Sequence, residues 1–227
     1  MDPPFPILYE DNHLLVIVKP AGLATMGVGP DKPSLLRLAQ QYIKEKYAKP
    51  GNVYLGTVSR LDAPVTGIVL FARTSKAAAR LSEQFRDRGV EKIYWAIVRP
   101  GPIPPEGTWQ DWVAKDERHR RMHIVQEGNP KAQNAILSYR SLSDYDAGQL
   151  VEIELKTGRK HQIRLQFGSR GFPVLGDRKY RGNATDFSSG IALHARRLTF
   201  THPIRNEPLQ LLAPLPPSWD ALGVNGS

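Results

Sequence analysis

The sequence of 227 residues contains no cysteine. This excludes disulfide bridges, cysteine-ligated zinc or iron–sulfur sites and thiol nucleophiles. It also lacks any apolar run near the ~20 residues that a membrane-spanning helix needs, and it does not begin with the basic, then hydrophobic, stretch of an export signal. We therefore expect a cytoplasmic protein that makes no use of a membrane.

The composition does not favour disorder. Hydrophobic residues make up 41% and charged residues 23% of the chain, values typical of soluble globular proteins. The length is sufficient to bury a substantial core. No internal repeat or low-complexity linker divides the chain. We expect a single folded domain over residues 1–227.

Positive charge is in clear excess. Lys and Arg number 31 against 22 Asp and Glu, which gives a net charge of +9 and a pI near 9.8. The excess lies in two blocks, residues 60–99 (eight basic minus four acidic, +4) and 150–227 (eleven minus six, +5). Such blocks favour a polyanionic partner such as RNA, because neutralised phosphates release counterions. The alternative is a solvated basic surface with no partner.

Short apolar runs and amphipathic segments predict strands interspersed with a few helices. Residues 7–9 and 14–18 are expected to form a hairpin. The stretch from Pro100 to Pro130 is rich in Pro and Gly, so we expect a loop-dominated excursion with at most one hairpin, whose basic residues 118–121 are candidates for contact with RNA. This succession predicts an α+β fold on a mostly antiparallel sheet. The other expected strands are 68–72, 93–98, 135–142, 150–155 (with a turn at 143–148), 193–199 and 209–212, and the expected helices are 34–47, 75–88 and 161–169.

Three segments place charged residues in or beside strongly apolar strands, where functional sites are commonly built. The first is SRLDAPVTG at 59–67, in which Arg60 and Asp62 leave an extended chain on the same side. The second is EKIYWAIV at 91–98, in which Lys92 and Tyr94 share one face of a strand. The third is TGRKHQIR at 157–164, a cationic helix start that favours anions. Taken singly, each is more simply explained by a structural ion pair or a core aromatic residue.

Metal and nucleotide cofactors are not indicated. His119 and His123 are four residues apart but lack a third ligand, so we interpret them as solvated histidines. The sequence Gly27-Val28-Gly29 is too short for a dinucleotide-binding loop. We expect neither a metal nor a cofactor.

Six ordered motifs extend over nearly the whole chain, and together they resemble the RluA-type pseudouridine synthase family. The resemblance implies an isomerase that converts uridine to pseudouridine within RNA without metal or cofactor. It also implies an α+β fold with a bent sheet, flanking helices and a central active-site cleft. The motifs are ILYEDNHLLVIVKPAGL at 7–23, RLD at 60–62 followed by Gly67, KIYWAIV at 92–98, TGRKHQIR at 157–164, GFPVLGDRKY at 171–180 and LHARRLTFTHP at 193–203.

Residue by residue, the resemblance implies that Asp62 is the catalytic carboxylate and that Tyr94 takes the C5 proton. Arg159 would be the cation paired with Asp62, and a guanidinium there favours the ionised aspartate. Arg60 would insert where the target base leaves the stack. We expect RNA contacts from Arg60 together with Lys92, Lys160, His161 and Arg164.

The chain departs from the family pattern around the aspartate. Ser59 stands where the family usually has His, and Pro64 and Val65 precede Thr66-Gly67 in place of the usual Thr-Ser-Gly. These differences affect support of the loop and choice of target. Because the motifs begin at Ile7, we expect no preceding S4-like RNA-binding domain, and we expect a monomer.

Several alternatives stay open at this stage. The carboxylate serves equally a direct attack on C1′ and removal of a ribose proton to give a glycal. Ribosomal RNA, transfer RNA or both fit as substrate. A noncatalytic RNA-binding protein or RNA chaperone on the same fold is a second hypothesis, and it predicts that Asp62 is dispensable. A glycosidase of small nucleosides is a third, although it would not need the charge of +9.

Overall fold

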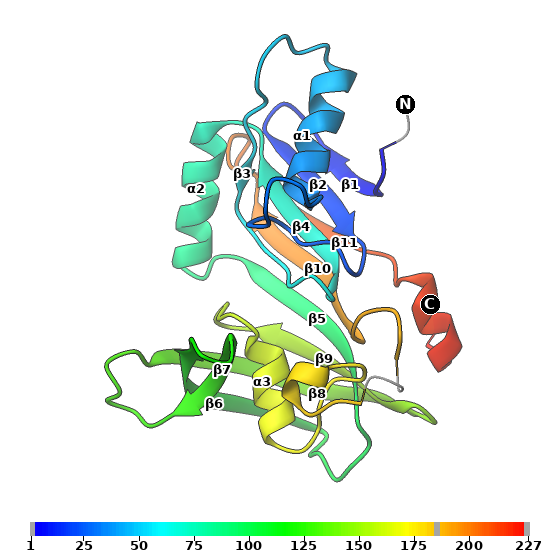
Figure 1. The fold of residues 1–227 in the computed structure, drawn as a ribbon. Helices are drawn as coiled ribbons and strands as arrows, with labels where there is room; N and C mark the ends of the chain where they lie inside the picture. The colour runs from blue at the N-terminus through cyan, green and yellow to red at the C-terminus, as the bar shows by residue number, and fades with distance from the viewer. Residues whose placement is uncertain (1–2, 184–186, 225–227) are drawn as a thin grey trace. The chain divides into compact units, whose positions relative to one another are not determined.

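A computed structural model describes residues 3–183 and 187–224 (Figure 1). The chain forms two compact units. The first contains the residues up to Val90 together with Ala195–Pro214. The second contains Glu91–His194 and the residues from Leu215 onward.

The first unit contains short strands, and the pairs β1–β2, β2–β4, β3–β4 and β10–β11 are antiparallel. The central order is β1-β2-β4-β10, with β11 added to β10 and β3 added to β4. Strands β2 and β4 pair in antiparallel register from Leu14 opposite Ala72 to Lys19 opposite Gly67. The strands are β1 Ile7–Glu10, β2 Leu14–Lys19, β3 Gly56–Thr57, β4 Thr66–Ala72, β10 Leu193–Thr201, of which all but the first two residues belong to this unit, and β11 Pro208–Leu212.

Two helices cover opposite faces of these strands. Helix α1 (Leu35–Lys46) is capped by Ser34, and helix α2 (Ser75–Arg86) is capped by Thr74. The side chains of β2 and β4 alternate between two cores, one shared with α1 and the other with α2. Burial on both faces explains why β2 and β4 are continuous apolar runs.

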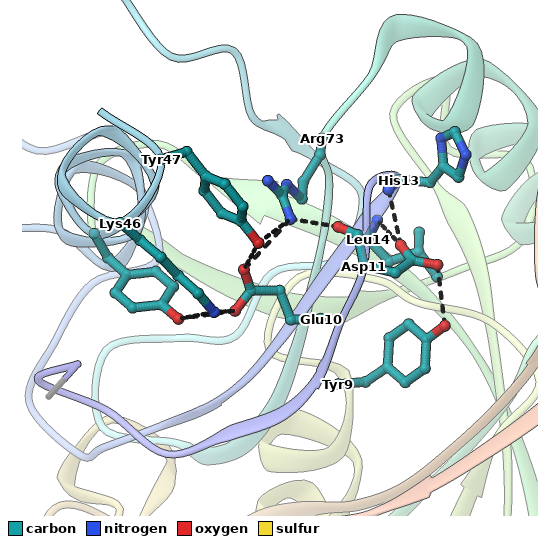
Figure 2. A network of polar contacts seen from close by, with 9 residues as sticks. Tyr9, Glu10, Asp11, His13, Leu14, Lys46, Tyr47 and Arg73 are labelled. Atoms are coloured by element: carbon teal, nitrogen blue, oxygen red, sulfur yellow. Dashed lines mark hydrogen bonds and ion pairs between the residues drawn. The ribbon is translucent and has the colours of Figure 1, made fainter. Parts of the chain in front are cut away.

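A polar network fixes the turn between β1 and β2 (Figure 2). The Asp11 carboxylate accepts backbone N–H groups of His13 at 2.8 Å and Leu14 at 2.7 Å. His202, fully buried, contacts Asp11 through Nε2 at 2.9 Å and accepts the N–H of Arg205 at Nδ1. Burial raises the pKa of Asp11, but these hydrogen bonds together lower it more, so the net shift is downward.

Glu10, on the same turn, joins α1 to the sheet. Its carboxylate accepts hydrogen bonds from Lys46 at 2.8 Å and Tyr47 at 2.7 Å and lies 3.4 Å from Arg73 (Figure 2). Burial raises the pKa of Glu10, and the hydrogen bonds from Lys46 and the tyrosines lower it below its ordinary value. The turn is therefore held by ionised carboxylates at neutral pH.

The second unit contains an antiparallel sheet in the order β5-β9-β8-β6-β7. Helix α3 (Gln162–Ser169) packs against it through a small core that includes Leu165 and Met122. In the part of the chain that the structure describes, two 3-10 helices follow, Arg178–Tyr180 and Pro217–Leu222. The strands are β5 Glu91–Val98, β6 Glu106–Asp116, β7 Arg121–Val125, β8 Gln133–Tyr145 and β9 Gly148–Leu155.

The predicted α+β fold with mostly antiparallel pairing is confirmed, as are the helices and the first hairpin. The one hairpin allowed for between Pro100 and Pro130 is present, since β7 pairs with the end of β6. The expectation that loops dominate this stretch was wrong, because β6 and β7 occupy 16 of its residues and β6 also pairs with β8. The turn expected at residues 143–148 is also shorter, since β8 continues to Tyr145, which pairs with Gly148. In both places charged and polar side chains face solvent and obscure the strand pattern.

Candidate active site

Asp62 lies on a short loop of the first unit whose backbone is held on both sides. Before it, Leu61 exchanges two hydrogen bonds with the buried hydroxyl of Thr25: the N–H of Leu61 donates at 3.1 Å, and its carbonyl accepts at 2.9 Å. After it, the carbonyl of Ala63 accepts the N–H of Gly22 at 2.8 Å. The half-buried Asp62 is therefore placed by a loop with little freedom to move.

A hydrogen bond from Val65 to Asp62 closes the turn that leads from this loop into β4. The carbonyl of Asp62 accepts the N–H of Val65 at 3.1 Å, and the chain then enters β4 through Thr66 and Gly67. Gly67 has φ of +107°, and a Cβ there would lie 2.4 Å from the carbonyl oxygen of Ala195. Only glycine permits this close approach of β4 to β10.

A buried lysine lies beneath the same loop. Lys19, at the end of β2, has no exposed surface, and its ammonium donates to the carbonyls of Pro20 at 2.8 Å, Leu23 at 2.8 Å and Ala63 at 3.0 Å. Burial lowers the pKa of Lys19 to about 8, while the charge of Asp62 raises it against that effect. Three carbonyl acceptors match the three N–H groups of an ammonium, so the charged form is held at neutral pH.

Lys19 was missed in the sequence, although a signal was present. It directly follows the buried run LLVIV and precedes Pro20-Ala21-Gly22, so a charged residue occurs in a strand that is otherwise apolar. Lysine is almost never fully buried without partners. A lysine at such a position is therefore expected to have specific hydrogen-bond partners inside the protein.

Ser59, one of the departures from the family pattern, supports the loop from its other end. Its hydroxyl accepts the N–H of Leu70 in β4 at 2.9 Å. Arg60, which follows, is exposed. The serine therefore ties this segment to β4, and the neighbouring Arg60 lies at the surface.

In the second unit, Tyr94 lies in β5 opposite Ile153 of β9 and is half-buried, as is Lys92 two residues earlier. The strand period places these two side chains on one face. Trp95, on the other face, donates its indole N–H to Glu152 at 3.2 Å.

Arg159 is fixed at the start of α3 by two side chains of its own motif. Gln162 accepts the N–H of Arg159 at 3.0 Å and the hydroxyl of Thr157 at 2.7 Å. The Arg159 guanidinium donates from Nε to the carbonyl of Asn134 at 2.8 Å. Thr157 and Gln162 are both buried. The arginine is therefore tied to β8 through its Nε, which fixes the direction of the guanidinium.

The remaining candidates of this motif differ in exposure. Lys160 is exposed, and His161 is half-buried with φ of +55° and its Nδ1 2.7 Å from the hydroxyl of Tyr180. Arg164 is buried and forms a two-pronged ion pair with Asp177, at 2.6 and 2.8 Å. Its described contacts are those of an internal structural pair, and its expected contact with RNA stays a prediction.

The structure thus groups the candidates within each unit. Asp62 and Arg60 share one loop of the first unit; Lys92 and Tyr94 share β5, and Arg159, Lys160, His161 and Arg164 share the start of α3 in the second. The ion pair between Asp62 and Arg159 stays a prediction. Among residues 3–183 and 187–224, no cluster of three histidine or acidic side chains is arranged to hold a metal ion. No helix in those ranges is long and apolar enough to cross a membrane.

The antiparallel α+β architecture and the order of these motifs define a pseudouridine synthase fold. The family model described as RNA pseudouridylate synthase matches residues 13–169. The human protein RNA Pseudouridylate Synthase Domain Containing 4 has a solved structure that superposes with a TM-score of 0.78 at 27% identity, covering 97% of this chain and 94% of that one. The chain belongs to the RNA pseudouridylate synthase family, whose members are isomerases that convert uridine to pseudouridine in RNA.

Two curated relatives show the range of named substrates. Ribosomal large subunit pseudouridine synthase D of Nitrosomonas europaea is 35% identical over 229 residues, covering 96% of this chain and 64% of the relative. The tRNA pseudouridine synthase C of Pectobacterium carotovorum subsp. carotovorum is 31% identical over 233 residues, covering 95% and 59%. The chain therefore spans about three fifths of the length of these two relatives.

Proposed function

We propose that this chain isomerises specific uridines of ribosomal or transfer RNA to pseudouridine. Family membership and the two named relatives support this activity. The observation that carries it is the placement of Asp62: a carboxylate on a loop clamped by Thr25, Gly22 and the buried ammonium of Lys19. A loop held in this way suits a residue that acts on a reacting atom.

The reaction breaks the bond between N1 of uracil and C1′ of ribose and forms a bond between C5 and C1′. The proton on C5 leaves, and N1 gains one, so the substrate and product have the same composition. Breaking the N1–C1′ bond builds positive charge on the ribose, which the carboxylate of Asp62 stabilises or captures, much as in retaining glycosidases. Removal of a ribose proton by Asp62 is the other route, and both routes need the same ionised carboxylate.

Tyr94 and Arg159 complete the proposed site. Tyr94, from β5, stacks on the extruded uracil and takes the C5 proton. Arg159, directed through its hydrogen bond to Asn134, is proposed to pair with Asp62 and favour its ionised form. The exposed Arg60 is proposed to occupy the space that the base leaves, which offsets part of the few kcal/mol that unstacking costs.

The partner is therefore an RNA, contacted by Arg60 and by Lys92, Lys160, His161 and Arg164. Ribosomal and transfer RNA are found in the cytoplasm, so we expect the protein to act there. We expect a monomer with no metal or cofactor, which light scattering and metal analysis of the purified protein would test.

The experiment that tests this function is tritium release from C5-labelled uridine. The substrate is bulk ribosomal and transfer RNA from a strain that lacks the gene, incubated with the wild type, Asp62→Ala or Asp31→Ala. Asp31 is an exposed acidic residue, so its variant controls for the loss of one negative charge. We expect release by the wild type and Asp31→Ala only. Release by none of them, from RNA that the protein binds, would favour the noncatalytic alternative.

A further inference from the structure

The hairpin of β6 and β7 ends in a tip with a high density of basic residues. The tip spans Lys115 to His123, and four of its nine residues are Lys or Arg. All four are exposed, as are both histidines. Arg118 and Arg120 form no ion pair with any residue in the described part of the chain. The positive charges of these two guanidinium groups are therefore exposed to solvent and available to an anionic partner.

The two acidic residues of the tip each form an ion pair with a cationic side chain nearby in the sequence. Asp116 accepts the backbone N–H of His119 at 3.0 Å and contacts the His119 ring at 2.7 Å, and Arg121 lies 3.7 Å from the same carboxylate. Glu117 forms an ion pair with Lys115 at 2.7 Å. These contacts close the turn and neutralise its acidic groups, which leaves Arg118 and Arg120 to set the charge of the tip.

The tip is tied to the start of α3. The buried hydroxyl of Tyr180 accepts the N–H of Met122 in β7 at 2.8 Å and lies 2.7 Å from Nδ1 of His161. Lys179 donates to the carbonyl of Arg120 at 3.2 Å, which brings a further cation to the tip. An anion bound at the tip is therefore held in a fixed position relative to the segment that carries Arg159.

We infer that the tip of the β6–β7 hairpin is a docking site for the phosphate backbone of RNA, through the guanidinium groups of Arg118 and Arg120. Guanidinium groups bind phosphate oxygens through paired, charge-assisted hydrogen bonds. The tip carries no Phe, Tyr or Trp on which a base would stack, and its freest cations are suited to phosphates, so it positions the RNA without reading sequence. This inference rests on the proposed function, because it names the part of the substrate that lies away from the target uridine.

The test compares two double variants that lose the same charge. The first is Arg118→Gln with Arg120→Asn; Asn is chosen because Arg120 has φ of +49°, which Asn tolerates. The control is Lys49→Gln with Arg86→Gln, two exposed cations of the first unit. Affinity for transcribed large-subunit ribosomal RNA is measured from 50 to 300 mM KCl, and tritium release is measured in single turnover at saturating enzyme. Thermal unfolding verifies that both variants are folded.

We expect the tip variant to reduce the slope of log K against log [salt] by about 1.4 to 1.8, that is, by two phosphate contacts of about 0.7 to 0.9 each. Its affinity near 0.15 M salt should fall about tenfold, while the single-turnover rate at saturation stays within about twofold of the wild type. The control should change both quantities much less. Equal losses in the two variants, or no loss at the tip, would overturn the inference. If the wild type binds but releases no tritium, the proposed function fails, while the binding comparison still decides the role of the tip.

Discussion

Replacing Lys19 with methionine tests whether the buried ammonium holds the loop of Asp62. Methionine has a similar length but no charge and no N–H group. The substitution leaves the carbonyls of Pro20, Leu23 and Ala63 without the ammonium donor, and it removes a positive charge that interacts with Asp62. The variant should therefore lose both stability and activity.

The magnitude follows from two opposing terms. Losing three hydrogen bonds to a charged donor costs about 1.5–3 kcal/mol each, or about 4.5–9 kcal/mol in total. Against this, the fall in the pKa of Lys19 to about 8 means that burial of its charge costs about 3 kcal/mol, which methionine does not incur. The net loss of unfolding free energy is then about 1.5–6 kcal/mol at pH 7.

This loss should depend on pH in a defined direction. Because the pKa of Lys19 is lower in the folded than in the unfolded chain, the unfolded chain binds more protons between about pH 8 and 10.5. Stability from this group therefore rises with pH in that window. The difference between the wild type and Lys19→Met should widen by about 2 kcal/mol from pH 7 to pH 9.5.

Urea unfolding at the two pH values measures both quantities, with the exposed Lys44→Met as the matched control. Tritium release by Lys19→Met should also fall about tenfold or more, because the carbonyl beside Asp62 loses one of its two donors. A methionine variant as stable and as active as the wild type, with no widening at pH 9.5, would refute the role given to Lys19.

Three further predictions concern stability. Gly67→Ala should lower the unfolding free energy by about 3 kcal/mol or more, because its Cβ would meet the backbone of Ala195; a melting temperature within 2 °C of the wild type would contradict this. Tyr180→Phe should cost about 1–3 kcal/mol and speed hydrogen exchange at the Met122 amide, which loses its acceptor; unchanged exchange would rule out the tie. The pKa of Asp11 is lowered, so its contribution to the free energy of unfolding is present above about pH 4 and is lost as the pH falls. Asp11→Asn should therefore reduce the loss of stability between about pH 5 and pH 2, and an unchanged acid dependence would argue against this role.

Local elements could be predicted wherever one face of a segment is apolar and its ends carry standard signals. Ser34 before α1 and the alternation in β9 are examples. The β6–β7 hairpin could not be predicted in the same way, because only three of the sixteen residues in its strands are buried and most of the exposed ones are polar, so neither strand is an apolar run. Its strand state is set by pairing with β8, a long-range contact that no local window contains.

The site was likewise predictable only in part. The motifs named Asp62, Tyr94 and Arg159, but the supports of Asp62 come from Lys19, Gly22 and Thr25, about 40 residues earlier. Pairing between β2 and β4 brings these segments together, and the sequence gives no direct sign of that register. The basic motif also gives no sign that one of its cations, Arg164, is buried in an ion pair with Asp177, a residue 13 positions later in the chain.

The most direct test of the central claim is to map pseudouridine in ribosomal and transfer RNA from a deletion strain supplied with either the wild type or Asp62→Asn. Asparagine keeps the shape of the side chain but cannot stabilise charge at C1′ as a carboxylate or accept a ribose proton. The account predicts that defined sites disappear in the deletion strain, return with the wild type and stay unmodified with Asp62→Asn, although the variant is folded and binds RNA. Return of those sites with Asp62→Asn would contradict the role of the carboxylate.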